Sequence, residues 1–363
     1  MMQPRPDITI TAAATARTVL AGVADDRVLL RTAAELTRDL QRPSPWIYWP
    51  DLGISATLAY AALAGAIMAH STWVAWACGG MAVLALYRAT LFIHEITHLN
   101  HAQLPGFRLG WNVLVGVPTM LPSFLYEGIH TQHHTRVKYG TIEDPEYLPL
   151  ALMKPWSVPL FFVASVLMPI GLIVRFGVIG PLSLLIPRLR TLVVERFSGL
   201  QMNPAYRRRP PEGAFARIWF WQELGASLMA LALLAGAITG LLPLHALLVY
   251  GAVIAGTALL NQARTLVAHR WENAGEPLTV TAQFLDSTNV PDGVLPLLWA
   301  PVGLRYHALH HLLPSLPYHA LSAAHRRIAA AQGAGSTYAR ANYPTLRGLL
   351  GHLMRSTMTR GRA

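Results

Sequence analysis

Four long apolar segments limit what this chain can fold into more than any other feature. They cover about residues 52–69, 73–93, 218–242 and 244–262, close to the roughly 20 apolar residues that a helix needs to cross a bilayer. Charged residues make up only 13% of the 363 residues and hydrophobic residues 53%, which is too apolar for a typical soluble domain. We therefore expect an all-α membrane protein with four transmembrane helices and no nucleic acid partner.

The connectors inside each pair of segments are very short and carry no basic residue. His70–Thr72 joins the first pair and Pro243 alone joins the second, so each pair must form a tight hairpin. The basic residues, apart from Arg88, lie in the first 50 residues, between the hairpins and after Gln262. The positive-inside rule then places both termini and the middle segment in the cytoplasm. We expect the membrane to be a bacterial inner membrane.

Three histidine clusters lie on this same expected side. They are His94-Glu-Ile-Thr-His98, His130-Thr-Gln-His133-His134 and His307-Ala-Leu-His310-His311. Residues three or four apart share one face of an α-helix, so each cluster can direct its imidazoles to a common place. A structural zinc site is filled by four ligands, so eight converging histidines indicate two metals or two separate sites.

Two further apolar stretches, about residues 109–125 and 156–187, do not fit a simple span. A single crossing in either would place the clusters on opposite sides of the membrane, so we predict re-entrant or interfacial helices. Arg175 lies in the second stretch. The prolines that interrupt the two stretches are Pro118, Pro122, Pro159, Pro169 and Pro181.

The chain divides into three predicted parts. Residues 1–50 form a cytoplasmic N-terminal segment, in which about residues 13–40 have the apolar repeat of an amphipathic surface helix. Residues 51–327 form the membrane domain, and residues 328–363 form a cytoplasmic tail. The net charge of +11 is explained either by basic loops on anionic lipid or by a docking surface for an acidic protein. We interpret Arg207 to Arg209 as an interfacial anchor.

Several other residues are candidates for the metal site. Asn261, Thr265 and His269 are spaced by four and would line one helix face. On spacing alone, His269 is as well explained by an interfacial histidine as by a ligand. His101, one turn beyond His98, is either a ligand or a hydrogen-bond partner. Carboxylates that could orient imidazole N–H groups are Glu95, Glu143, Asp144 and Glu146.

Residues from about Tyr87 to Arg327 resemble the integral-membrane fatty acid desaturases and their hydroxylase relatives. The three-cluster arrangement is specific to that family, and the stretch from Arg305 to the prolines after His311 is similar to its third histidine box. The resemblance implies a non-haem di-iron site above a mushroom-shaped stem of four helices, with His269 as an extra ligand. Related acyl-CoA enzymes have an Asn one turn before that histidine, where this chain has Thr265.

The resemblance further implies an acyl-chain desaturase that uses two iron ions, O2 and two electrons. A lipid or acyl thioester would enter from the membrane through an apolar tunnel. The sequence contains no haem or flavin module, so we expect a separate ferredoxin or cytochrome b5-like donor with its reductase. Proposed tunnel walls are Trp111, Phe124, Trp219 and Trp221.

Three alternatives remain open at this stage. Hydroxylation or ketolation of a lipid or carotenoid uses the same scaffold. His94-Glu95-x-x-His98 also matches the zinc metalloprotease signature, with Glu95 as general base, but a protease leaves most of the other histidines unexplained. A metal transporter would place its ligands inside the spans rather than at their ends.

Overall fold

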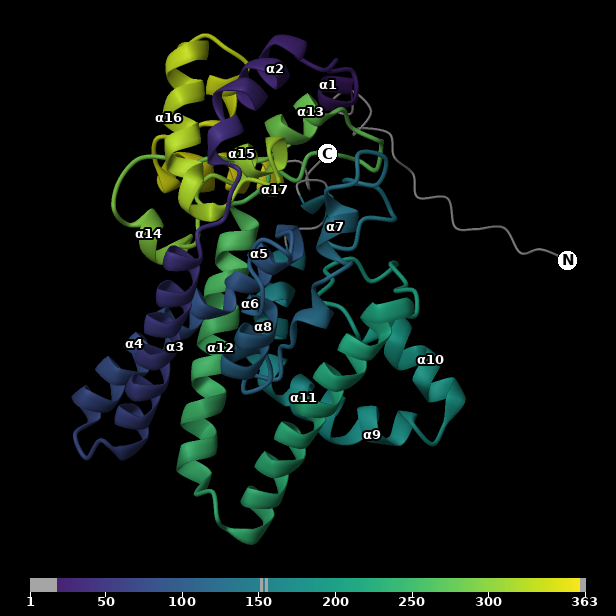
Figure 1. Cartoon of the computed structure of the whole chain (residues 1–363), viewed down its shortest axis with the longest axis vertical. Coiled ribbons are helices and arrows are strands. Elements are labelled where there is room, and N and C mark those ends of the chain that lie inside the picture. Colours follow the sequence, from purple (N-terminus) through teal and green to yellow (C-terminus); the bar gives the residue numbers. More distant parts are fainter. Residues whose placement is uncertain (1–17, 151–152, 154–155, 360–363) are drawn as a thin grey trace, which may run out of the picture.

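The stem of the molecule consists of two helical hairpins. The computed structural model describes residues 18–150, 153 and 156–359. The first hairpin is α3 (Pro45–Met68) with α4 (Thr72–Thr90), and the second is α11 (Gly213–Thr239) with α12 (Leu244–Leu266). Both project away from the rest of the molecule in the same direction (Figure 1). In the described ranges there is no β-strand, only isolated bridges, so the predicted all-α class is confirmed.

The helices of the stem are longer than the apolar segments that predicted them. α3 begins at Pro45, seven residues before the predicted span, and α11 begins at Gly213 rather than 218. A proline is well suited to the first turn of a helix, where its missing N–H is not needed. The apolar residues predict only the part of each helix that lipid can cover. The helical backbone hydrogen bonds continue beyond that part, toward the cap.

A fifth helix is long and apolar enough to cross a membrane by length and composition. It runs from Ser157 to Ser183 through α8 (Ser157–Ile173), the π-helix η5 (Val174–Ile179) and α9 (Gly180–Ser183). Its prolines do not interrupt it as the sequence suggested. Pro159 lies in the first turn and Pro181 at the start of α9, where prolines are tolerated, and only Pro169 lies inside α8.

The segments that precede and follow this helix nevertheless lie next to each other in the cap. Met202 N donates to Pro145 O at 2.8 Å, so the two ends of the excursion meet. The returning helix α10 (Pro187–Arg196) carries three arginines and a glutamate, which do not fit a lipid-exposed span. This path agrees with the predicted re-entrant or interfacial helix, and the count of four crossing helices stays a prediction.

The other interrupted stretch, residues 109–125, forms short helices packed against the stem. These are α6 (Phe107–Trp111), the π-helix η2 (Asn112–Gly116) and the 3₁₀-helix η3 (Ser123–Leu125). Trp111 is fully buried and its indole N–H donates to Ala89 O of α4 at 2.8 Å. None of the three is long enough to cross a bilayer, as predicted for this stretch.

Helices from both ends of the chain form a cap above the stem (Figure 1). The described part of the predicted amphipathic helix over 13–40 is instead two α-helices and the 3₁₀-helix η1 (Arg38–Leu40), and the second α-helix starts where Asp26 accepts from Leu29 N. Residues 13–17 lie outside the described residues. The boundary predicted at 327 falls inside α16. The helices of the cap are α1 (Thr18–Ala21), α2 (Arg27–Leu36), α5 (Phe92–His98), α7 (His130–His133), α13 (Val280–Asp286), α14 (Pro296–Trp299), α15 (His307–Leu312), α16 (Leu321–Gln332) and α17 (Leu346–Thr359).

The basic run before α11 is not a surface anchor throughout. Arg207 and Arg209 are exposed, but Arg208 is 5% exposed and donates to Phe124 O and Glu127 O, both at 2.6 Å, and to Ser198 O. Its guanidinium also lies 4.3 Å from the centre of the Trp219 ring. Arg208 therefore joins the loop before α7 to α10 and α11, a role that the charge pattern did not indicate.

The topology can be tested by cysteine labelling in a Cys78→Ser background. We expect an impermeant thiol reagent added outside intact cells to label Leu241→Cys at the tip of the second hairpin. Ile142→Cys and Arg209→Cys, both exposed positions in the cap, should react only after the cells are opened. Strong labelling of either cap position from outside would disprove the single-sided arrangement.

Candidate metal centre

All nine histidines predicted as ligands come together in two adjacent groups. In each group one ligand atom per residue lies within 4.8 Å of the others. Five form the first group, namely His94, His98, His130, His134 and His310. Four form the second, namely His133, His269, His307 and His311. We call these the five-histidine group and the four-histidine group.

The spacing of the second and third clusters explains how they divide between the groups. His130 and His134 are four apart, about 40° around a helix, and both belong to the five-histidine group. His133 precedes His134 directly and points about 100° away from it, into the four-histidine group. The third cluster has the reverse arrangement, because His307 and His311 join the four-histidine group and His310 joins the other.

Helix ends hold these histidines in position. α5 continues α4 after a single residue, so His94 and His98 extend from the end of the stem. The first N–H groups of α15 need partners outside the helix. Ala308 N donates to Thr288 O at 3.0 Å and Leu309 N donates to the side chain of Asn289 at 3.0 Å, which fixes the third cluster.

His269 does not continue α12, contrary to the helical spacing. The helix ends at Leu266, and His269 lies in a bridge with Ser287 at the end of α13. Thr288 donates through its hydroxyl to Val267 O at 2.6 Å and through its N–H to Ala268 O at 2.9 Å. These bonds draw the chain off the helix axis and bring His269 into the four-histidine group.

The donor set fits metal ions. Several ring nitrogens face one another directly, as His307 Nε2 and His269 Nε2 do at 2.9 Å and His310 Nε2 and His134 Nε2 do at 3.1 Å. Within the described part of the chain, both ring nitrogens of His94 and Nε2 of His98 are buried without a hydrogen-bond partner. Such converging lone pairs are what a metal ion would satisfy, and imidazole is a ligand suited to iron.

Burial also keeps the imidazoles in the form that binds metal. Loss of solvent, followed by the charge of neighbouring groups, lowers the pKa of His130, His134, His269 and the three histidines of α15 well below its usual value. His133 is the exception. Burial alone would lower its pKa, but the charge and hydrogen bond of Asp144 outweigh that effect and raise it. Asp144 is therefore the carboxylate that acts most directly on a histidine of the site.

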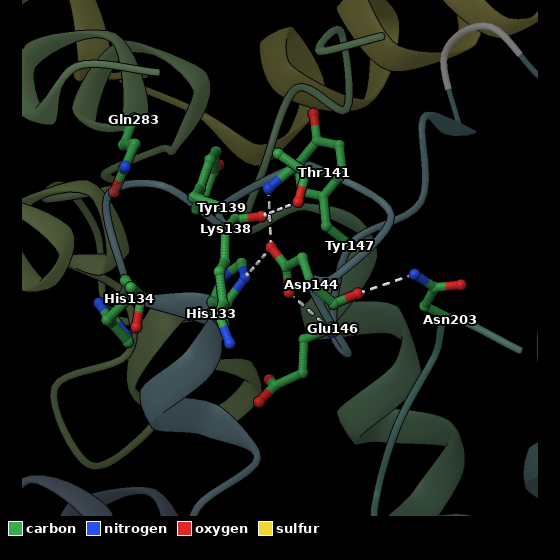
Figure 2. Close-up of polar contacts among 12 residues, drawn as sticks. His133, His134, Lys138, Tyr139, Thr141, Asp144, Glu146, Tyr147, Asn203 and Gln283 are labelled. Carbon is green, nitrogen blue, oxygen red and sulfur yellow. Dashed lines mark hydrogen bonds and ion pairs between the residues drawn. The ribbon is translucent and has the colours of Figure 1, made fainter. Parts of the chain in front are cut away.

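A layer of acidic and phenolic side chains holds the outer nitrogens of three histidines. His133 Nδ1 lies 2.8 Å from Asp144, and Figure 2 shows this carboxylate pointing at His133 while Asn203 reaches its backbone. His130 Nδ1 lies 2.9 Å from Glu146 and 2.9 Å from the Tyr126 hydroxyl. Such outer contacts fix the orientation of a ligating imidazole.

His269 is held through a relay that the sequence did not reveal. Tyr139 OH lies 2.9 Å from His269 Nδ1 and donates to Asp286 at 2.8 Å, and Tyr147 OH donates to the same carboxylate at 2.7 Å. Asp286 is fully buried, and burial raises its pKa. The two tyrosines lie more than 100 positions from His269 and Asp286 in the chain, so no spacing pattern could have connected them.

The other predicted residues lie outside the two groups. Glu95 is buried and accepts from the Tyr48 hydroxyl and from Tyr318 N, and its nearest oxygen is 3.9 Å from His94 Nδ1. Glu143 is exposed and pairs with Lys138 at 3.7 Å. His101 is half-exposed, lies 3.3 Å from Arg108 and belongs to neither group.

A cavity of about 650 Å³ opens beside the histidines. Its lining includes apolar side chains of α8, such as Phe161, Met168 and Leu172, and also five of the histidines, namely His94, His130, His133, His269 and His307. Trp111 lines it as predicted. Phe124 and Trp219 do not, because they stack on each other in the core with ring centres 4.6 Å apart. Trp221 is 65% exposed on α11.

Comparison with known proteins defines the class. The family profile described as fatty acid desaturase matches residues 71–342, so the chain belongs to that family. A protein named ceramide hydroxylase, from Caulobacter vibrioides (strain NA1000 / CB15N), is 45% identical over 337 residues, which cover 93% of this chain and 96% of that protein. No solved structure matches the chain. Family and relative together indicate an oxidoreductase of the di-iron type, as the histidine groups suggest.

The role of Asp144 can be tested against its neighbour Glu143. Asp144→Asn removes the negative charge beside His133 and should weaken iron binding by about 10- to 100-fold. Glu143→Gln changes the adjacent, exposed carboxylate in the same way and should leave iron binding unchanged. Competition with a chelator measures both affinities. Equal affinities in the two variants would show that Asp144 does not support a metal ligand.

Proposed function

We propose that this protein is an O2-dependent di-iron hydroxylase of a ceramide-type membrane lipid. The observation that carries the proposal is the pair of histidine groups beside a largely apolar cavity. The 45% identity to a ceramide hydroxylase over nearly the whole length of both chains supports hydroxylation. Desaturation of an acyl chain, which the family resemblance implied, stays a prediction and is the second candidate. Both reactions begin by breaking an unactivated C–H bond.

The nine histidines would hold two irons, with five imidazoles facing one and four facing the other. Bound iron, with O2 and two electrons, supplies the oxidising power that no side chain has. The protein contributes orientation and exclusion of water. Tyr126 and Glu146 fix His130, Asp144 fixes His133, and the apolar lining of α8 keeps the reacting carbon away from solvent.

A protease is a poor explanation of this site. A zinc protease needs three protein ligands and a carboxylate free to act on a bound water. Here Glu95 is engaged by Tyr48 and Tyr318, and seven histidines besides His94 and His98 gather at the same place. The metal transporter is likewise unsupported, because most of the histidines lie in the cap rather than along the stem helices.

The electrons would come from a separate protein. We propose a ferredoxin or cytochrome b5-like carrier, with its reductase, that docks on the cap. We also propose that the cap faces the cytoplasm of a bacterial inner membrane, as the distribution of basic residues predicts.

The reaction can be decided by mass spectrometry of the lipid product. Purified protein should contain two irons per chain and convert a ceramide into a product with one additional oxygen atom. Loss of two hydrogens instead would establish the desaturase. His310→Ala should abolish turnover, whereas His245→Ala, in the first turn of α12 at the opposite end of the stem, should be near neutral. Zinc without iron, together with no turnover after iron reconstitution, would disprove both oxidative reactions.

The dependence of turnover on salt concentration tests whether the carrier docks electrostatically. The net charge of +11 should attract an acidic carrier, so turnover at limiting carrier should fall as salt rises. The screening length shrinks from about 10 Å at 0.1 M to about 3 Å at 1 M ionic strength. Saturating carrier should largely restore the rate. A rate at limiting carrier that is independent of salt would exclude electrostatic docking.

A further inference from the structure

One face of α12 carries polar side chains into the cavity beside the histidines. Four polar residues of this helix line the cavity, namely Thr257, Asn261, Arg264 and Thr265. Their spacings of four, three and one place them on one side of the helix. We call these four residues the polar stripe. An acyl chain alone would need no such residues. Thr257 and Asn261 lie within the predicted span, where polar side chains are unfavourable unless they serve a purpose.

The cavity contains polar atoms whose hydrogen bonds are not made. Among the described residues, Thr257 Oγ1 and Arg264 Nε are buried without a partner. The same holds for Gln262 Nε2, Gln201 Oε1 and one terminal nitrogen of Arg175, and all five side chains line this cavity. Thr257 as a whole is only 4% exposed. Buried polar atoms normally have partners, so five exceptions around one cavity point to a bound polar group.

Arg264 is charged, so an unmet hydrogen bond on its buried nitrogen is more costly than one on a neutral group. Within the described ranges no carboxylate lies within ion-pair distance of it, and its terminal nitrogen donates to neutral oxygens, Asn261 Oδ1 at 3.2 Å and Thr265 Oγ1 at 3.0 Å, while the neutral hydroxyl of Tyr87 is a further neighbour. A half-buried guanidinium with an unused N–H is a strong donor to an oxygen acceptor. The position therefore suits a carbonyl oxygen of a ligand.

The unused atoms define the chemistry of that ligand. Arg264, Gln262 and Arg175 offer N–H donors, Thr257 offers a hydroxyl, and Gln201 offers an acceptor oxygen. A ligand with a carbonyl and at least one hydroxyl satisfies this set. The thioester group itself offers a single carbonyl and no donor, and a hydrocarbon chain offers neither.

We infer that the polar stripe, together with Gln262, binds the amide carbonyl and hydroxyl groups of a neutral amide-linked lipid. This inference rests on the proposed function and names the specificity-determining residues of its substrate site. Because the polar stripe and the histidines line one cavity, the carbon presented for oxidation lies near the polar head rather than far along a chain.

The test measures binding to the purified, iron-loaded protein in detergent. The probe is a radiolabelled N-acylsphinganine, compared with its 3-deoxy analogue and with stearoyl-CoA. Thr257→Val keeps the shape of the side chain and should weaken binding by about 2- to 10-fold, and Arg264→Met by about 10- to 100-fold. Arg209→Met, an exposed arginine in the loop before α11, is the matched control and should bind like the unchanged protein.

A structural role would give a different result. Removing an unpartnered hydroxyl should leave the melting temperature of ligand-free Thr257→Val unchanged or higher, whereas loss of a structural hydrogen bond would lower it. The 3-deoxy analogue should bind the unchanged protein more weakly, and Thr257→Val should add little further loss. Unchanged affinity in both stripe variants, equal binding of the analogue, or stearoyl-CoA binding as tightly as the amide lipid would overturn the inference.

Turnover separates this inference from the proposed function. If the unchanged protein oxidises the ceramide and the stripe variants bind and oxidise it equally well, the polar stripe has no role and the proposed function stands. If binding depends on the polar stripe but iron, O2 and a donor yield no oxidised lipid, the inference stands and the proposed function fails.

Discussion

The burial of nine imidazoles in one place is the constraint on which the rest of this structure depends. Polar rings taken out of water are costly unless their nitrogens find partners, and these rings mainly face one another. The nine histidines come from positions 94 to 311, so helices of the stem and of the cap must be in place together to bring them near one another. The two hairpins support the histidine groups, because α5 follows directly from the first hairpin and His269 follows closely after the second.

Around the histidines, the outer contacts are not distributed evenly. The four-histidine group is held by Asp144 and, through Tyr139, by Asp286, both of which are fully buried. In the five-histidine group a carboxylate hydrogen-bonds only His130, among the described residues. Each group therefore has one carboxylate in direct contact with a histidine, and the four-histidine group has a second one through Tyr139. Arg208 supports both indirectly, because it fixes the loop that leads into α7.

The sequence predicted the parts of this structure that depend on local pattern. Apolar length and the position of basic residues predicted both hairpins, and the H-x-x-H-H spacing predicted that the histidines would converge. It could not predict contacts between distant positions, such as Tyr139 with Asp286, because these depend on how the helices pack. Hydrophobicity also could not tell which aromatic side chains pack in the core and which line the cavity. Phe124 and Trp219 are as apolar as Trp111, yet only Trp111 lines the cavity.

Each H-x-x-H-H cluster contributes histidines to both groups, so α7 and α15 are shared supports rather than parts of one site. A helix that is displaced when one group lacks its ion carries a ligand of the other group with it. If each group binds an ion, as proposed, the first ion would order helices that also carry histidines of the other group.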